Sequence, residues 1–164
     1  MLPLLFRSSI GVEFDISSVV REILRYMRED TRKEYKIIIG TDSMGFHNKM
    51  ADFVTAIVVH RVGNGGRYFW RRIELGKFYT LRDRIIREVL LSLEIAETLL
   101  KEIEKTEHTF PIPKWTFEIH ADVGVNGPTN VLIQEIVGMI RASNYEVKTK
   151  PESYAASHVA DMYT

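Results

Sequence analysis

Two apolar, strand-like runs that each lead into an aspartate constrain this chain more than any other feature. The first is Ile37–Ser43, which carries Asp42, and the second is Phe117–Asp122. A long amphipathic segment separates the two runs. Carboxylates that come together from separate elements repel one another and shift each other's pKa values unless a cation neutralises them. The pattern therefore predicts a divalent-metal site.

The topology of the predicted sheet determines whether the two aspartates meet. A crossover through the long intervening helix makes the two strands parallel neighbours, so that both aspartates leave the same sheet edge. Ligands of open α/β sheets bind at such carboxyl ends. By itself, Asp42 is equally typical of a turn after a strand, and Asp122 is equally typical of a turn or a helix cap. The predicted site therefore depends on this strand pairing.

Helical phase ranks the glutamates of the long helix, which we expect from about Thr80 to Lys105. Its apolar positions step by three or four residues and are Ile85, Val89, Leu93, Ala96, Leu100 and Ile103. At about 100° per residue, Glu88 falls at the edge of this stripe and Glu94 points away from it. Glu88 is therefore the predicted ligand, and the alternative is an exposed glutamate paired with Arg84.

The C-terminal segment is rich in small and polar residues and predicts a last helix over residues 151–161. Ser157, His158 and Asp161 fall within one helical turn, so a hydroxyl, an imidazole and a carboxylate can face one cleft. His158 is either a proton shuttle or a surface histidine. Residue types alone would allow a Ser-His-Asp triad, but no nucleophile elbow supports it.

The remaining periodicities predict an α/β fold with a five-stranded mixed sheet. An N-terminal helix from Asp15 to about Asp30 precedes elements in the order βββαβαβα. The expected strands cover residues 35–42, 53–61, 67–75, 115–121 and 145–149. The expected helices cover residues 80–105, 129–142 and 151–161, and Gly63–Gly66 form the turn of a hairpin. The first three strands should be antiparallel neighbours.

Composition limits the classes of protein and partner. The 164 residues, 45% of them hydrophobic, fit one domain with a sizeable core. Lys+Arg and Asp+Glu each number 22, so a polyanionic partner would need a local patch or a metal. The absence of cysteine excludes disulfides, thiolate zinc sites and cysteine nucleophiles. No segment has a signal-peptide or transmembrane pattern, so we expect a cytoplasmic protein without membrane contact.

Basic residues gather on the predicted hairpin around a short aromatic run. The arginines are Arg61, Arg67, Arg71 and Arg72, and the aromatic residues are Tyr68, Phe69 and Trp70. Such a cluster is able to hold phosphates and stack bases. A solvated face over an aromatic core is the more common origin of the same pattern.

Three motifs resemble a bacterial family of uncharacterised ribonuclease H-like proteins. They are Ile39–Ser43, Ile119–Gly124 and Lys150–Ser157, and the resemblance covers almost the whole chain beyond the first helix. The wider ribonuclease H-like superfamily includes junction resolvases, transposases and proofreading nucleases. Its four acidic positions match Asp42, Glu88, Asp122 and Asp161 of this sequence. The resemblance implies that these four residues are catalytic and bind metal.

The function implied by the resemblance is a metal-dependent nuclease. Phosphodiester bonds of DNA or RNA would be hydrolysed by a two-metal-ion mechanism, with Asp42 bridging the ions. Hard oxygen ligands favour Mg²⁺ or Mn²⁺ over zinc. The residues expected to bind the substrate are Ser43, Lys150, Ser153, Ser157 and His158.

Two other classes of function are compatible with the same sequence. The neutral net charge suits a non-catalytic module that keeps the fold and binds nucleic acid or protein. Metal-assisted hydrolysis or transfer on a small phosphorylated substrate would use the same carboxylates. Fold alone does not separate these classes, because function depends on the site.

Overall fold

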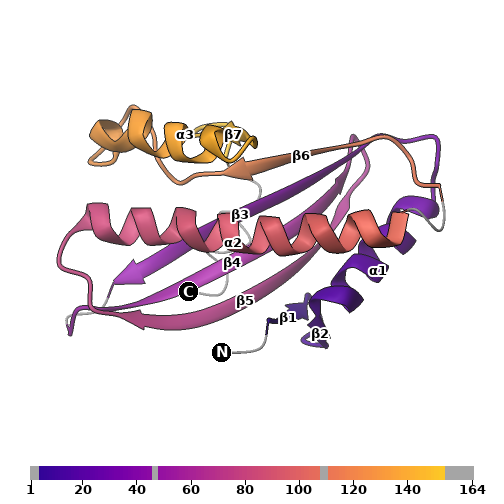
Figure 1. Ribbon diagram of the computed structural model, residues 1–164, viewed down its shortest axis with the longest axis horizontal. Coiled ribbons are helices and arrows are strands. Elements are labelled where there is room, and N and C mark those ends of the chain that lie inside the picture. The colour runs from indigo at the N-terminus through magenta and orange to yellow at the C-terminus, as the bar shows by residue number, and fades with distance from the viewer. Residues whose placement is uncertain (1–3, 46–47, 108–110, 154–164) are drawn as a thin grey trace.

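A seven-stranded mixed sheet with helices packed on it forms the fold (Figure 1). The computed structural model describes residues 4–45, 48–107 and 111–153. The strands are β1 (Leu5–Ser8), β2 (Glu13–Asp15), β3 (Tyr35–Gly45), β4 (Met50–Arg61), β5 (Gly66–Gly76), β6 (Trp115–His120) and β7 (Glu146–Lys148). The helices are α1 (Ile16–Arg28), α2 (Leu81–Glu107) and α3 (Ile133–Ala142), with a 3-10 turn η1 (Asn130–Leu132) before α3.

The strand order is β2-β1-β5-β4-β3-β6-β7. Strands β3, β4 and β5 are consecutive antiparallel neighbours, as the sequence predicts. After β5 the chain passes through α2 and returns as β6, which pairs in parallel with β3. It then passes through α3 to β7, which is parallel to β6. The predicted crossover between the two aspartate-bearing strands is therefore confirmed.

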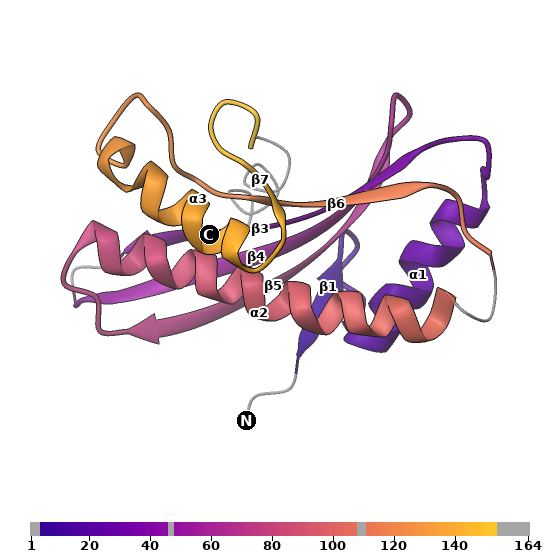
Figure 2. The same ribbon diagram turned by 45° about the horizontal axis from the view of Figure 1, so that its top comes forward.

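The sheet has one face covered by the helices, which we call the helix face. Its strand residues Ile37, Ile39, Ile57 and Ile119 belong to the main hydrophobic core together with residues of all three helices. Helix α2 runs along the length of the sheet, and α1 and α3 contact it (Figure 2). On the other side, which we call the opposite face, Ile38 and Ala56 form a separate small cluster. Alternation of side chains along β3 and β4 produces this division.

Helix α1 begins at the residue that the sequence predicts. The side chain of Asp15 caps the helix and accepts a 2.8 Å hydrogen bond from the backbone N–H of Ser18. This bond satisfies one of the N–H groups that a helix leaves without a partner in its first turn. The apolar stripe of α1 then packs its buried residues Val19, Ile23 and Met27 into the main core.

The prediction of five strands is wrong, because β1 and β2 add an antiparallel hairpin to the β5 side of the sheet. These strands have only four and three residues, which is too short for an alternation of apolar and polar residues to be recognised in the sequence. Their connection places Gly11 at a φ of 81°, a value that glycine tolerates. Phe6, fully buried, attaches the hairpin to the main core.

Three predicted boundaries also differ from the structure by three residues or more. Strand β4 begins at Met50, three residues before the predicted start at Phe53. Strand β3 continues three residues beyond Asp42 because β4 pairs with it as far as Gly45. Helix α3 starts at Ile133, since residues 130–132 form a 3-10 turn instead of the first helical turn.

The predicted last helix lies mostly outside the described residues. Residues 151–153 form a turn, and residues 154–161 belong to the part of the chain that the structure does not describe. Among the described residues, no helix combines the length and the apolar character needed to cross a membrane.

Candidate metal centre

The register of β3 and β6 places the two aspartates side by side. The last parallel pair between these strands is Gly40 with His120. Asp42 and Asp122 each follow their member of this pair by two residues. Because strand β6 ends at His120, β3 continues past it with an open edge, and the Asp42 carboxylate lies at that edge. Because both aspartates follow the last paired residues by the same number of positions, they lie next to each other where the parallel pairing ends.

Three carboxylates from separate elements meet at this point. One ligand oxygen from each of Asp42, Glu88 and Asp122 can be chosen so that all three lie within 4.8 Å of one another. Asp42 comes from β3, Glu88 from α2, and Asp122 from the segment after β6. Glu88 is 3% exposed, and the two aspartates are partly buried. The arrangement concentrates negative charge in a place with little access to water.

The position of Glu88 follows from its place at the edge of the apolar stripe. Its neighbour Val89 and the preceding Ile85 are buried in the main core, so the Glu88 side chain is carried toward the sheet. Glu94, which helical phase assigns to the outside, is exposed. The Ser43 hydroxyl donates a short 2.5 Å hydrogen bond to Glu88 Oε2. This bond joins β3 directly to α2 at the centre of the cluster.

Burial raises the pKa of the Glu88 carboxyl well above its usual value of 4.5. The hydrogen bond from Ser43 acts in the opposite direction, the charges of Asp42 and Asp122 raise the pKa further, and Arg84 lowers it. A buried carboxylate among like charges is costly unless a cation compensates it. The surroundings of Glu88 therefore favour either a bound proton or a metal ion.

A buried hydroxyl network lies next to the carboxylates and was not predicted from the sequence. The Thr41 Oγ1 atom is 2.7 Å from Ser92 Oγ on α2 and 2.9 Å from Thr55 Oγ1 on β4. Thr41 precedes Asp42 in β3, and Ser92 lies one helical turn after Glu88. The network fixes α2 against the sheet beside both ligand candidates. Its only sequence signal is a serine placed on the apolar side of α2.

Lys150 contacts the cluster through Asp122. The Lys150 Nζ atom lies 2.7 Å from Asp122 Oδ1. The backbone of Lys150 is held in place because its N–H donates a 2.8 Å hydrogen bond to the Val123 carbonyl. An ideal Cβ on Gly124 would come within 2.9 Å of the Lys150 Cβ, so the absence of a side chain at Gly124 permits this approach. The lysine supplies a positive charge beside the three carboxylates.

The remaining predicted site residues divide into three groups. Ser43 and Lys150 contact members of the cluster. Ser153 is buried in the turn that follows, and its backbone N–H donates to the Thr149 carbonyl. Ser157, His158 and Asp161 lie outside the described residues.

His120 is a packed and hydrogen-bonded histidine. Its Nε2 atom lies 2.8 Å from Glu118 Oε1, and both side chains are buried. Burial lowers the pKa of His120, although the neighbouring Glu118 carboxylate acts to raise it. The pair borders a cavity of about 360 Å³ that Lys36 and Lys148 also line.

The donor set fits a hard divalent cation. Carboxylate oxygens from Asp42, Glu88 and Asp122 are the ligands that Mg²⁺ and Mn²⁺ prefer. Burial is the main reason that the pKa of Glu88 is raised, and a cation beside this buried carboxylate would compensate its charge. No cysteine is present in the chain to favour a softer metal.

Comparisons with known proteins agree with this architecture. Residues 18–164 match the protein family described as ribonuclease H-like. The uncharacterised protein YkuK of Bacillus subtilis is 30% identical over 167 residues, and the alignment covers 98% of this chain and 96% of that protein. No solved structure matches the chain. The chain belongs to the ribonuclease H-like family.

Proposed function

We propose that this protein is a metal-dependent nuclease that hydrolyses phosphodiester bonds in nucleic acid. The observation that carries the proposal is the convergence of Asp42, Glu88 and Asp122 within 4.8 Å in a ribonuclease H-like chain. These carboxylates come from β3, from the segment that follows its parallel neighbour β6, and from the helix between the two strands. Three elements that are far apart in the sequence thus supply one cluster of hard ligands.

In this proposal Asp42, Glu88 and Asp122 hold Mg²⁺ or Mn²⁺, and Asp161 is a fourth ligand from outside the described residues. When bound, such ions supply Lewis acidity for hydrolysis and offset the negative charge of the phosphodiester. Ser43 keeps the Glu88 carboxylate oriented through its hydrogen bond. No side chain of the protein acts as a nucleophile.

Lys150 has a binding role in this proposal. Its ammonium group is half-exposed and lies next to Asp122, so it can reach a phosphate oxygen of a diester at the carboxylates. Without a cation at the cluster, the same group compensates part of the charge of Asp122. The nucleic-acid substrate therefore approaches a site where a basic side chain already adjoins the acidic ones.

The proposal is tested with end-labelled single-stranded DNA, RNA and a DNA–RNA hybrid. Each is incubated with wild type, Asp42→Asn and Glu94→Gln in Mg²⁺, Mn²⁺ or EDTA. We expect cleavage of at least one substrate by wild type and Glu94→Gln in metal alone, and a loss of at least about 100-fold in Asp42→Asn. Binding of every substrate without cleavage by wild type would favour the non-catalytic binding module. Equal cleavage by wild type and Asp42→Asn would assign the activity to another site or to a contaminant.

A further inference from the structure

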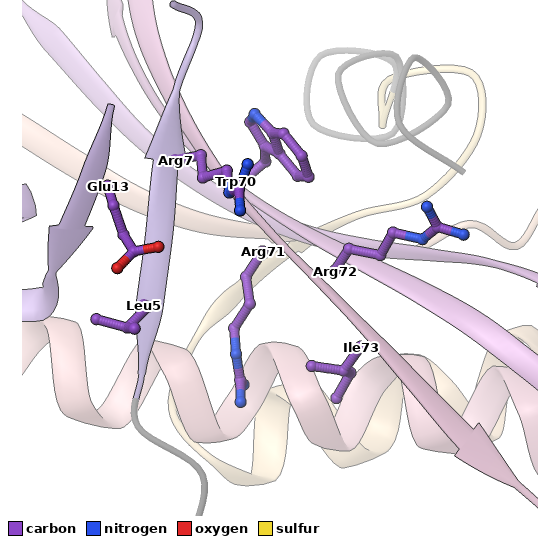
Figure 3. Close-up of a pocket in the computed structure, with 7 residues that line it drawn as sticks. All are labelled: Leu5, Arg7, Glu13, Trp70, Arg71, Arg72 and Ile73. Carbon is purple, nitrogen blue, oxygen red and sulfur yellow. The ribbon is translucent and has the colours of Figure 1, made fainter. Parts of the chain in front are cut away.

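A second cavity, of about 480 Å³, lies where the β1–β2 hairpin meets β5 (Figure 3). Leu5, Arg7 and Glu13 from the hairpin and Trp70, Arg71 and Arg72 from β5 line it. Strand β1 pairs with β5 only through Arg7 with Trp70 and Ser8 with Phe69. In the described part of the chain, no strand pairs with the β1 side of β5 from Arg71 onward, whereas β4 pairs with its other side as far as Gly76. The cavity therefore forms around the edge of β5, just beyond the end of β1.

The cavity has more positive charge than its own residues neutralise. Three arginines and one glutamate line it. Arg72 forms an ion pair with the buried carboxylate of Asp52, which leaves some of its five N–H donors for other partners. Within residues 4–45, 48–107 and 111–153, the side chains of Arg7 and Arg71 have no hydrogen bond or ion pair. The guanidinium N–H groups of the cavity wall are therefore able to bind an anion in a bidentate way.

Arg71 shows this lack of a partner most clearly. It projects from β5 toward α2, whereas Arg7, Trp70 and Arg72 lie on the other side of the strand (Figure 3). Partial burial lowers the pKa of Arg71, and the charge of Glu94 opposes that effect. A guanidinium that loses water without gaining a hydrogen-bonded anion is uncompensated. A phosphate in the cavity would supply the missing anion, in the two-pronged geometry that arginine recognises.

The register connects this cavity with the carboxylate cluster. Arg72 pairs with Val54, and Val54 pairs with Asp42. Cross-strand partners lie side by side, so Arg72 and Asp42 stand at the same level of the sheet, two strands apart. Two strand spacings of about 4.8 Å separate their backbones by about 10 Å. A chain of linked phosphates is able to reach from the carboxylates to the cavity.

We propose that this cavity binds a nucleotide unit of single-stranded nucleic acid at the edge of β5, with one of its two flanking phosphates on Arg71, the other on Arg7, and its base against Trp70. The position of the unit next to a strand cleaved at Asp42 rests on the proposed function, whereas binding itself does not. An aromatic wall beside basic groups suits an unstacked base, which a single strand offers and a duplex does not. The volume is within the range of pockets that hold small ligands.

The test is the affinity for a fluorescein-labelled dodecathymidylate, measured by anisotropy in EDTA at several fixed salt concentrations. Arg7→Gln and Arg71→Gln should each weaken binding by at least about fivefold and reduce the salt slope by about 1. Arg32→Gln is the matched control, because it removes the same charge from a side chain that is 87% exposed in a distant loop. It should change affinity by less than about twofold. Thermal melting of each variant checks that the fold is retained.

Trp70 provides a second readout. In a Trp115→Phe background, Trp70 is the remaining tryptophan, because the chain contains two. Its fluorescence should be quenched by unlabelled dodecathymidylate and unaffected by a duplex of the same length. Wild type that fails to bind the single strand, or variants at Arg7 and Arg71 that bind it as tightly as Arg32→Gln, would overturn the inference.

Cleavage of bis(p-nitrophenyl) phosphate with Mn²⁺ separates this inference from the proposed function. This small diester needs the carboxylates but not the cavity, so Asp42→Asn should abolish its hydrolysis and Arg71→Gln should not. If Arg71→Gln binds the oligonucleotide weakly and wild type does not cleave the diester, nucleotide binding in the cavity is supported and the proposed nuclease activity is rejected. If wild type cleaves the diester and Arg71→Gln binds the oligonucleotide as tightly as wild type, the nuclease proposal is supported and nucleotide binding in the cavity is rejected.

Discussion

The Ser43 hydroxyl lies 2.5 Å from Glu88 Oε2, so that a strand residue next to Asp42 directly orients a helix carboxylate. This contact crosses from β3 to α2 over 45 positions of sequence. It lowers the pKa of Glu88, while burial raises the pKa by more. The balance leaves a buried carboxyl group whose charge depends on pH and on bound cations.

The first prediction concerns this titration. Because the pKa of Glu88 is raised in the folded state, its contribution to stability is fully present below the unfolded value of 4.5 and is lost as pH rises through the folded pKa. In EDTA, Glu88→Gln should therefore be more stable relative to wild type at pH 8 than at pH 4. Urea denaturation at both pH values measures the difference. A constant difference between the two proteins would contradict the raised pKa.

The second prediction concerns metal-dependent stability. Mg²⁺ or Mn²⁺ should raise the melting temperature of wild type, because a cation that binds only the folded state stabilises it by mass action. Asp42→Asn and Glu88→Gln should abolish the shift. Glu94→Gln should keep it, since Glu94 is exposed on the same helix. An equal loss in the Glu88 and Glu94 variants would reject the assignment made from helical phase.

The third prediction concerns Lys150, whose ammonium group lies 2.7 Å from Asp122. A cation that binds the three carboxylates must share them with this positive charge, so Lys150→Gln should tighten Mn²⁺ binding several-fold. Isothermal titration calorimetry measures the change. Lys101→Gln is the control, because Lys101 pairs with the exposed Glu97 on the outside of α2. Weaker Mn²⁺ binding in Lys150→Gln would mean that Lys150 helps to form the site instead of competing with the metal.

The fourth prediction concerns the buried hydroxyls. Thr41→Val leaves Ser92 and Thr55 without their shared partner at nearly constant volume, and should lower the free energy of unfolding by about 1–3 kcal/mol. Thr98→Val is the matched control, since its hydroxyl bonds to the Glu94 carbonyl one turn earlier in its own helix. It should cost less than about 0.5 kcal/mol. Urea denaturation that gives equal losses for the two variants would show that the network adds nothing to stability.

Periodicity and topology made the central features predictable. The spacing of apolar residues on α2 distinguished Glu88 from Glu94, and the structure buries the first and exposes the second. The crossover rule predicted that β3 and β6 are parallel neighbours, which places Asp42 and Asp122 together. Both inferences depend on regularities that extend over many residues. Such regularities are visible in a single sequence.

Features that depend on contacts between distant residues were not predictable. The β1–β2 hairpin is stabilised by the burial of Phe6 and not by any local pattern. The extension of β3 to Gly45 follows from pairing with β4, and the Thr41 network requires the position of α2 to be known. The cavity beside Arg71 exists because β1 is short. Each of these is determined by tertiary packing.

The most direct test of the metal site is anomalous diffraction from a crystal soaked in Mn²⁺. The account predicts an anomalous peak that contacts the carboxylates of both Asp42 and Asp122, with Glu88 beside it. A second peak would lie roughly 3.5–4 Å from the first if two ions are held. Asp42→Asn crystals under the same conditions should lack the peak. A wild-type crystal with no anomalous density between Asp42 and Asp122, at Mn²⁺ concentrations that stabilise the protein in solution, would contradict the account.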